Sequence, residues 1–441
     1  MKKLSMLLIF TILIGILAAC SSNSGGAANE TGATQKPSST EGSSSSDGKK
    51  TTVHFWHSMG GANGERIDEM IKRFNESHAD IEVIGTFQGG YDDTVTKLQQ
   101  AIASKSGPDV SMIERAYVQM FAESEVLEDL KPYLQQAGIS EDEFSEGLMG
   151  HSYFNDELLS LPLNRSTPIL HVNKAILDEN NLQIPTTWAE LEQVANALVV
   201  KENGETTRYG VSMPYDTWYP LAMITQAGGT FFNEDGSSIG FYDNGVGLKV
   251  FEQLKKLQST GALFYPPTTD SGSIVNSMFK EGKVAMLYQS TGSIGGLLSA
   301  VDFDYVTAFL PKDEIYANPT GGANVSMLNG SSNKEAAWEF IRWMMVEPDG
   351  ALPFVLDSGY LPFTKTMIES EAVQELWKKE PIRKTAYDQL QYAVDTNKHV
   401  AWPSVMHEFF SAIEAIMYDS KDIQSTLDTF KKDAERILSK S

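Results

Sequence analysis

The feature that most constrains the fold is a regular alternation of strand-length apolar runs and amphipathic helical patterns, which begins at Thr51. Residues 52–56, 81–84 and 109–113 are predicted as three strands. A helix is predicted over about 92–104, and one before it has an apolar face at i, i+3, i+4 and i+7, formed by Ile67, Met70, Ile71 and Phe74. This strand–helix–strand–helix–strand order predicts an α/β fold with a mostly parallel sheet covered by helices.

The second half of the chain continues the alternation without an internal repeat. Thr187 and Glu190 form a capping box, in which each side chain satisfies a free backbone N–H group at the start of a helix. A strand is predicted over 284–288, and helices are predicted over 334–346 and 423–438. The buried face of the helix behind the capping box is predicted to contain Leu191, Val194, Ala195 and Leu198.

The N-terminus predicts export and attachment to a membrane. Lys2 and Lys3 precede an apolar run, residues 4–17, which is too short to span a bilayer comfortably. The run ends in the sequence LAAC, which matches the lipobox of bacterial lipoproteins. We therefore interpret residues 1–20 as a lipoprotein signal peptide and lipobox, with Cys20 as the lipidated residue. The alternative is an ordinary secretory signal in which the cysteine stands by chance.

The composition changes sharply after the signal. Residues 21–50 are rich in Ser and Gly and contain almost no apolar side chains, so they cannot bury enough surface to offset the entropy of ordering. They are predicted to be a disordered tether. Residues 51–441 exceed what one hydrophobic core normally serves, so we expect two lobes. No second apolar stretch is long enough to cross a membrane.

Composition and motifs exclude several classes of function. The formal net charge of −23, from 35 basic and 58 acidic residues, disfavours nucleic acid and anionic lipid as partners of the folded part. Cys20 is the only cysteine, so intrachain disulfides and thiolate metal sites are impossible. The motifs of zinc proteases, serine hydrolases, P-loop proteins and dinucleotide-binding proteins are absent from the sequence. Adjacent acids such as Asp92 and Asp93 are more typical of a helix start than of a catalytic pair. We expect neither an enzyme nor a bound metal or cofactor.

Hydroxyl, glycine and aromatic residues gather where the predicted strands end. In α/β folds ligands bind beyond the carboxyl ends of the strands, and uncharged donors at helix starts can bind an anion. Each of these turns taken singly is also common chain geometry. Tyr215 and Trp218 lie in a proline-broken segment, where they either stack on a sugar or polyol or cover an apolar patch. The turns lie at residues 89–91, 164–168, 290–293, 320–324 and 359–362.

Several of these segments resemble the extracellular solute-binding proteins of ABC importers, in the large sugar-type class, and among them the sn-glycerol-3-phosphate-binding proteins. The resemblance covers essentially all of residues 51–441. It is carried by Phe55-Trp56-His57-Ser58-Met59-Gly60, Arg73-Phe74-Asn75, Gly90-Tyr91, Asn164-x-Ser166-Thr167-Pro168, Ser290-x-Gly292-Ser293, Gly321-Gly322-Ala323 and Gly359-Tyr360-Leu361-Pro362.

The resemblance implies a two-lobed periplasmic-binding-protein-like fold of the maltose-binding-protein type (type II), with a hinge and an inter-lobe cleft. Its N-terminal lobe would contain residues 51–163 and about 303–360, and its C-terminal lobe residues 164–302 and about 361–441. The resemblance also implies the ligand contacts by position. Tyr91 would bind near a glycerol, and Tyr215 and Trp218 would line the pocket. The phosphate end would be held by Ser166, Ser290, Gly322 and Tyr360.

Two positions depart from the family pattern. Where the family has a glycerol-binding glutamate, a count without gaps from Tyr91 places Arg115, with Glu114 one residue before it. A one-residue slip would restore the acid, but it would also reverse the face of the side chain. His407 takes the place of an arginine late in the chain. Because Arg115 would replace an acceptor by donors, we expect a glycerophosphodiester or another phosphorylated polyol rather than plain glycerol 3-phosphate.

Taken together, the sequence predicts a monomeric, lipid-anchored solute-binding protein on the extracellular face of the bacterial membrane. It would capture sn-glycerol 3-phosphate, a glycerophosphodiester or another phosphorylated polyol between its lobes. The family implies permease subunits and an ATPase as partners, with the closed form recognised by the permease. An oligosaccharide is the alternative ligand, because aromatic faces stack on sugars. An extracellular phosphodiesterase or glycan hydrolase is a third reading, which would need a metal cluster or a close carboxylate pair.

Overall fold

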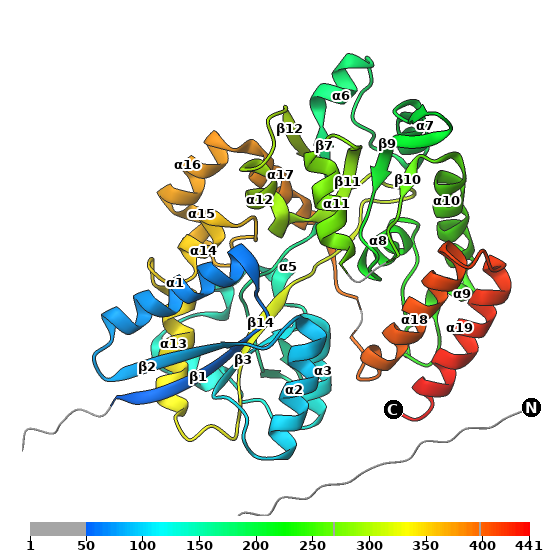
Figure 1. The fold of residues 1–441 in the computed structure, drawn as a ribbon. Coiled ribbons are helices and arrows are strands. Elements are labelled where there is room, and N and C mark those ends of the chain that lie inside the picture. The colour runs from blue at the N-terminus through cyan, green and yellow to red at the C-terminus, as the bar shows by residue number, and fades with distance from the viewer. Residues whose placement is uncertain (1–49, 268–269, 397) are drawn as a thin grey trace, which may run out of the picture. The chain divides into compact units, whose positions relative to one another are not determined.

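The structure of the protein is a computed structural model that describes residues 50–267, 270–396 and 398–441 (Figure 1). The predicted signal peptide, Cys20 and nearly all of the predicted tether lie outside the described residues. None of the helices in the described ranges is long and apolar enough to cross a membrane. The described chain contains two main β-sheets with helices around them.

The first sheet has the strand order β2-β1-β3-β14-β6. Strand β1 pairs in parallel with both β2 and β3, which confirms the predicted parallel arrangement of the first three strands. Strand β14, which comes from a distant part of the chain, runs antiparallel to both of its neighbours, β3 and β6. The strands of this sheet are β1 (Thr51–His57), β2 (Ile81–Phe87), β3 (Val110–Glu114), β6 (Leu161–Pro162) and β14 (Ala323–Met327).

The helices around the first sheet follow the sequence patterns closely. Helix α1 (Gly61–Ser77) buries the predicted apolar face, and Phe74 packs edge-on against Phe340 of α13 at 5.0 Å between ring centroids. Helix α13 has the predicted bounds. The helices here are α2 (Tyr91–Ala103), α3 (Val118–Glu123), α4 (Lys131–Ala137), α5 (Glu146–Met149), α13 (Lys334–Val346), α14 (Leu352–Asp357), α15 (Lys365–Glu369) and α16 (Glu371–Lys379). Helix α17 (Pro381–Asp388) follows them and contacts β12 (Tyr305–Ala308) of the second sheet.

The second sheet has the order β10-β9-β11-β7-β12, with β8 paired to β9. It is mixed, since β7 runs antiparallel to both β11 and β12. The prediction of a mostly parallel sheet is therefore wrong for this half of the molecule. The strands are β7 (Pro168–Asn173), β8 (Val200–Glu202), β9 (Glu205–Ser212), β10 (Leu263–Phe264), β11 (Val284–Ser290) and β12 (Tyr305–Ala308).

The helices around the second sheet include the predicted capping box. The Thr187 hydroxyl accepts from the Glu190 N–H group at 3.2 Å, at the start of α7, and α19 has the predicted bounds. The helices here are α6 (Lys174–Glu179), α7 (Trp188–Ala197), α8 (Trp218–Gln226), α9 (Gly240–Asp243), α10 (Val246–Thr260), α11 (Ser271–Lys280), α12 (Ile294–Leu298), α18 (Trp402–Met417) and α19 (Ile423–Leu438).

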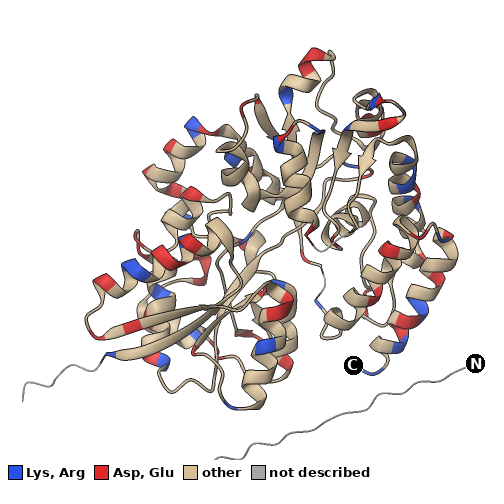
Figure 2. Cartoon of the chain, viewed as in Figure 1, with Lys and Arg blue, Asp and Glu red and all other residues tan. Residues whose placement is uncertain are grey.

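Short elements complete the described chain. Four are 3₁₀ turns, and four are strands that form two small sheets. In Figure 2 the charged residues lie mainly on helices and loops, while the strands of both main sheets are largely uncharged. The short elements are η1 (Arg115–Tyr117), η2 (Glu141–Glu143), η3 (Thr291–Ser293), η4 (Gln389–Tyr392), β4 (Tyr153–Phe154), β5 (Glu157–Leu158), β13 (Asn318–Pro319) and β15 (Ala393–Val394).

Three segments carry the chain between the two sheets. Strand β12 pairs with β7, and the chain returns to the first sheet between Ala308 and Ala323. Leu361 and Phe363 pack in the same apolar cluster as Phe55, while α17 contacts β12 of the second sheet. Helices α18 and α19 then pack on the core of the second sheet.

The crossing segments are tied to one another by buried hydrogen bonds. Ser166 and Gly321 form an antiparallel bridge, and β13 pairs with β15. The Gln389 side chain donates to the Pro168 carbonyl at 2.6 Å and accepts from the Leu310 N–H group at 2.8 Å. These bonds link all three segments, so the region between the sheets is a defined piece of structure and not a loose linker.

Candidate functional site

Two tyrosine hydroxyls lie together where the sequence predicts a binding site. Asn164 donates to the Tyr91 hydroxyl at 2.7 Å and accepts from the Ala323 N–H group at 2.9 Å. Tyr360 stacks on Phe354 with ring centroids 5.4 Å apart. Burial is the main cause that raises the pKa of both tyrosines. The charge of Tyr360 raises the pKa of Tyr91 further, and hydrogen bonding to Asn164 lowers the pKa of both by a smaller amount. Both phenols therefore stay protonated and can donate a hydrogen bond.

The glycine at 322 explains how the crossing segments approach so closely. Its φ of +86° lies in the left-handed region, and a Cβ atom there would be 2.0 Å from the Asn164 carbonyl oxygen. The Gly322 carbonyl accepts from the Arg115 N–H group at 3.2 Å. Ser166 is almost fully buried and uses its backbone N–H and C=O groups in the bridge to Gly321. Two predicted site residues, Ser166 and Gly322, thus contribute first to the backbone geometry of this region.

Ser290 ends strand β11 and caps the turn that follows. Its hydroxyl accepts from the Gly292 N–H group at 3.1 Å, which leaves the hydroxyl proton free for another acceptor. A Cβ atom at Gly292 would lie 2.7 Å from the Tyr360 ring, so the turn and Tyr360 are in close contact. The structure therefore brings Ser290 and Tyr360, two residues assigned to the phosphate end, to neighbouring positions.

The aromatic pair Tyr215 and Trp218 divides into two different environments. The Trp218 indole donates to the Pro319 carbonyl at 3.0 Å. A Cβ atom added at Gly321 would lie only 2.5 Å from the Trp218 ring. Trp218 is thus fixed against a crossing segment and remains partly exposed. The Tyr215 hydroxyl donates to the Phe410 carbonyl at 3.1 Å, and its ring contacts three other aromatic rings. Tyr215 therefore acts mainly in the packing under α18.

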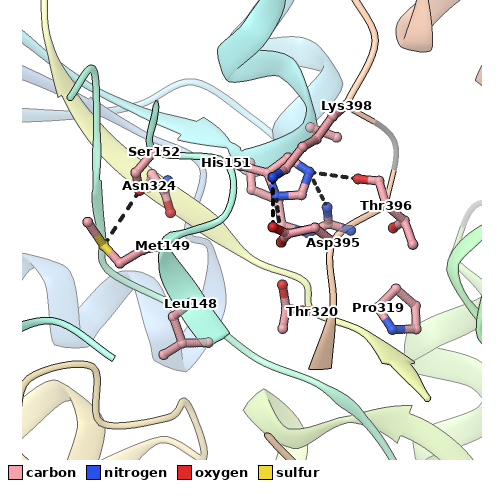
Figure 3. A network of polar contacts seen from close by, with 12 residues as sticks. Leu148, Met149, His151, Ser152, Pro319, Thr320, Asn324, Asp395, Thr396 and Lys398 are labelled. Carbon is pink, nitrogen blue, oxygen red and sulfur yellow. Dashed lines mark hydrogen bonds and ion pairs between the residues drawn. The ribbon is translucent and has the colours of Figure 1, made fainter. Parts of the chain in front are cut away.

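Arg115 does not take the position expected from the count without gaps. Its guanidinium is almost fully buried and approaches the His151 Nε2 atom at 3.0 Å, and His151 in turn lies 2.7 Å from the Thr396 carbonyl (Figure 3). Asp395 Oδ1 is 3.7 Å from His151 Nδ1. Strand β3 ends at Glu114, and the 3₁₀ turn that begins at Arg115 directs its side chain into this buried network. Arg115 is therefore a structural residue between β3 and the third crossing segment.

Glu114 is the last residue of β3, directly before Arg115. Its carboxylate accepts from the Ala116 N–H group at 2.8 Å and is 16% exposed, against 3% for the Arg115 side chain. Burial raises the pKa of Glu114, and the Arg115 charge partly opposes this shift. A one-residue slip in the comparison with the family would therefore place an acid, Glu114, at the position of the glycerol-binding glutamate.

Two further carboxylates surround this position. Asp92 accepts from the Tyr117 hydroxyl at 2.6 Å, and Asp216 accepts from the Trp218 N–H group at 2.9 Å. Burial is the main cause that raises the pKa of Asp216, and the charge of Asp92 adds to it. The charges of Asp92, Glu114 and Asp216 all raise the pKa of Tyr117, after burial. We call Asp92, Glu114, Tyr117, Asp216 and Trp218 the acidic end of the site.

His407 was also predicted as a site residue. It lies on α18 with its side chain exposed, while the adjacent Met406 packs against the apolar clusters of both halves of the molecule. The rotation of α18 is set by this packing, so its inward face presents Met406 instead of His407.

Sequence reasoning missed several residues that build the site. Arg165 is fully buried and donates to the Gly321 and Leu148 carbonyls at 2.9 and 2.8 Å, and to the Asn324 side chain at 2.9 Å. It fixes the crossing segment that carries Asn164 and Ser166. Burial and the charge of Arg115 lower the pKa of Arg165 to about 9. Asn164 was in the quoted motif, but Arg165 and Asp216 gave no signal, because Arg is seldom fully buried and a lone Asp is common.

The described chain also contains a cavity apart from the predicted site residues. A cavity of about 900 Å³ between η2, α5, α15 and α17 is lined by none of the predicted site residues. Within the described ranges, no three His, Cys, Asp or Glu side chains are placed to hold a metal ion. The hydroxyls of Tyr91, Tyr360 and Ser290 and the Glu114 carboxylate are groups that can form hydrogen bonds to a polar ligand.

Comparison with protein families gives a clear match. Residues 69–384 match the family model of bacterial extracellular solute-binding proteins, which is more than half of the chain. The chain belongs to this family. The sn-glycerol-3-phosphate-binding periplasmic protein UgpB of Escherichia coli (strain K12) is 26% identical over 360 residues, which cover 77% of this chain and 80% of that protein.

Solved structures show the same fold. UgpB from Mycobacterium tuberculosis, in complex with glycerophosphocholine, superposes with a TM-score of 0.79 at 23% identity, covering 89% of this chain and 99% of that one. An ABC substrate-binding protein from Listeria monocytogenes, in complex with cycloalternan, also gives a TM-score of 0.79, at 21% identity, covering 89% and 100% of the two chains. The fold is therefore the α/β periplasmic-binding-protein fold, as predicted.

The family settles the general role of the chain. It is a solute-binding protein of an ABC importer, and so a transport receptor that binds a small solute and not an enzyme. The family consists of extracellular proteins. In such a receptor the energy of ligand binding drives a change in the population of conformations, with no chemical step.

Proposed function

We propose that this receptor captures a phosphorylated polyol, such as sn-glycerol 3-phosphate or a glycerophosphodiester, between the two halves of the molecule. The proposal is carried by the protonated hydroxyls of Tyr91 and Tyr360, which both interact with Asn164, and by the turn capped by the Ser290 hydroxyl, which contacts the Tyr360 ring. Uncharged donors in a buried setting hold a phosphate by hydrogen bonds and release it unaltered. In this account Ser166, Gly322 and Arg165 keep those donors in place.

Two relatives support the ligand class. The Escherichia coli protein is named for sn-glycerol 3-phosphate, and the Mycobacterium tuberculosis protein was solved with glycerophosphocholine. Both ligands have a phosphate next to a glycerol. Here the glycerol would lie toward Tyr91 and Glu114, since a carboxylate accepts hydrogen bonds from hydroxyl groups. Because the Glu114 carboxylate acts on Tyr91 by charge and offers such an acceptor, we include plain glycerol 3-phosphate in the proposed class.

An oligosaccharide is the second candidate, and the acidic end favours it. Three carboxylates beside Trp218 offer acceptors for sugar hydroxyls and an aromatic face for stacking. The Listeria monocytogenes protein was solved with cycloalternan, a glycan. The two candidates would use Ser290 and Tyr360 differently, because a neutral glycan has no phosphate for these residues to bind.

Calorimetry with the full chain in mild detergent tests the proposal. The ligands are sn-glycerol 3-phosphate, glycerophosphocholine and a maltooligosaccharide. We expect saturable binding of a phosphorylated compound, weakened about tenfold in Tyr360→Phe because one buried hydrogen bond to a charged group is lost. Tyr209→Phe, on strand β9, is the matched control. Binding of the oligosaccharide alone would contradict the proposal, and turnover of any ligand would contradict a receptor role.

We further propose that Cys20 is lipidated and anchors the receptor to the outer face of the cell membrane, with residues 21–50 as a tether. The sequence LAAC before a Ser- and Gly-rich segment supports this proposal. The receptor would act as a monomer and deliver its ligand to permease subunits driven by an ATPase. Cys20→Ala is expected to release the protein from the membrane fraction into the medium. Retention of this variant in the membrane fraction would contradict lipid anchoring.

A further inference from the structure

A cavity of about 470 Å³ lies beside the predicted phosphate residues and is lined from both halves of the molecule. One wall is the N-terminal part of α1, which connects β1 and β2 of the first sheet. The opposite wall is α11 with η3 and α12, which flank β11 of the second sheet. In Figure 1 the N-terminal end of α1 lies next to α12. The volume is in the range of small-molecule sites.

The charged groups of this cavity are both cations. Arg66 of α1 lines it from one side and Lys280 of α11 from the other, and no carboxylate lines it. Arg66 donates to the Asn63 side chain at 2.9 Å, and among the described residues neither Arg66 nor Lys280 has a carboxylate within ion-pair distance. The whole chain has many more acidic than basic residues. We call this space, lined by Arg66 and Lys280, the basic cavity.

The basic cavity continues the predicted phosphate end. Gly292 and Ser358 line it, and both contact the phosphate residues directly. The Gly292 N–H group donates to the Ser290 hydroxyl at 3.1 Å, and the Ser358 hydroxyl accepts from the Tyr360 N–H group at 3.1 Å. The charge of Arg66 also lowers the pKa of Tyr360, although burial, which raises it, is the larger effect. A ligand held at Ser290 and Tyr360 would therefore have its anionic end next to two cations.

We propose that the basic cavity is an anion subsite, in which Arg66 and Lys280 neutralise the phosphate end of the ligand from opposite halves of the molecule. The identity of the ligand rests on the proposed function, but the selection of an anion rests on the cavity itself. Two cations that line one cavity repel each other, and an anion between them converts this repulsion into attraction. The subsite thus favours the ligand-bound arrangement of the two halves for phosphate-bearing ligands and not for neutral glycans.

Charge-removing variants of the full chain test the subsite. The variants are Arg66→Gln, Lys280→Gln and the double variant. The matched controls are Lys72→Gln, on the same helix as Arg66, and Lys283→Gln, next to α11; both are more than half exposed. We expect the double variant to bind the phosphorylated polyol about tenfold more weakly than wild type, with each single variant intermediate. The controls should bind as wild type. High salt should weaken wild-type binding more than binding by the double variant.

A second arm uses inorganic phosphate alone as the probe and thermal unfolding as the readout. Phosphate should raise the melting temperature of wild type and of both controls, but not of the double variant. Equal affinity of wild type and double variant for the phosphorylated polyol would overturn the subsite and leave the proposed function standing. A phosphate shift that depends on Arg66 and Lys280, without binding of any phosphorylated polyol, would overturn the proposed function and support the subsite. Equal melting shifts in wild type and double variant would overturn the subsite.

Discussion

The two ends of the candidate site differ in the kind of charge they present. The basic cavity, with Ser290 and Tyr360 beside it, contains cations and neutral donors and is lined by no carboxylate. The acidic end contains three carboxylates beside two aromatic rings. Tyr91 and Asn164 lie between them. An overall charge of −23 therefore says little about any one site, and a ligand with an anionic and a hydroxyl-bearing end would bind in a single orientation.

The largest effect is expected where the two ends are joined. Gly322→Ala would place a Cβ atom 2.0 Å from the Asn164 carbonyl at a φ of +86°, so the crossing segments must move apart. We expect a loss of about 3 kcal/mol in the free energy of unfolding and loss of binding at both ends. Gly330→Ala is the control, since nothing lies within 4 Å of its added Cβ atom. Equal denaturation midpoints for the two variants would show that the close contact at Gly322 is unimportant.

The next largest effect is expected at the acidic end of the site, where the Trp218 ring can stack on the ligand. Trp218→Ala should lower ligand affinity by about 2 kcal/mol, because an aromatic face that excludes water from the polar contacts is lost. Trp218→Phe keeps a ring and should retain most of the affinity. Calorimetry measures both variants. If Trp218→Ala bound ligand as tightly as wild type, the acidic end would play no part in recognition.

The smallest effect concerns the carboxylates without ligand. Burial raises the pKa of Glu114 and of Asp216. The folded state then binds more protons than the unfolded state above the usual carboxyl pKa, so these groups lower stability as pH rises through that window. Glu114→Gln and Asp216→Asn should therefore raise the melting temperature by a few degrees at pH 7, and by less at pH 5. A gain that is unchanged or larger at pH 5 would contradict burial as the cause.

Local patterns predicted much of the fold. The buried face of α1, the capping box of α7 and the bounds of α13 and α19 follow from periodicity and end signals that lie within about twenty residues. The sheet that each later strand joins did not follow, because β12 and β14 are separated only by the short strand β13 but belong to different main sheets. That choice depends on pairing with distant strands.

Local signals likewise indicated the positions of several candidate site residues. Tyr91, Ser290, Tyr360 and Trp218 lie after strands or at helix starts, where local signals place them, and the structure brings them to the region between the sheets. The directions of Arg115 and His407 could not be predicted, because they depend on a 3₁₀ turn and on the rotation of α18. A shift of one residue at either place exchanges an inward side chain for its neighbour.

A crystal structure of the receptor with sn-glycerol 3-phosphate bound tests the comparison of the two ends most directly. The account predicts the phosphate against Ser290 and Tyr360, toward Arg66 and Lys280, with the glycerol hydroxyls at Tyr91 and Glu114. A phosphate placed beside Asp92 and Asp216, or a site that stays empty while a neutral glycan fills it, would contradict the account.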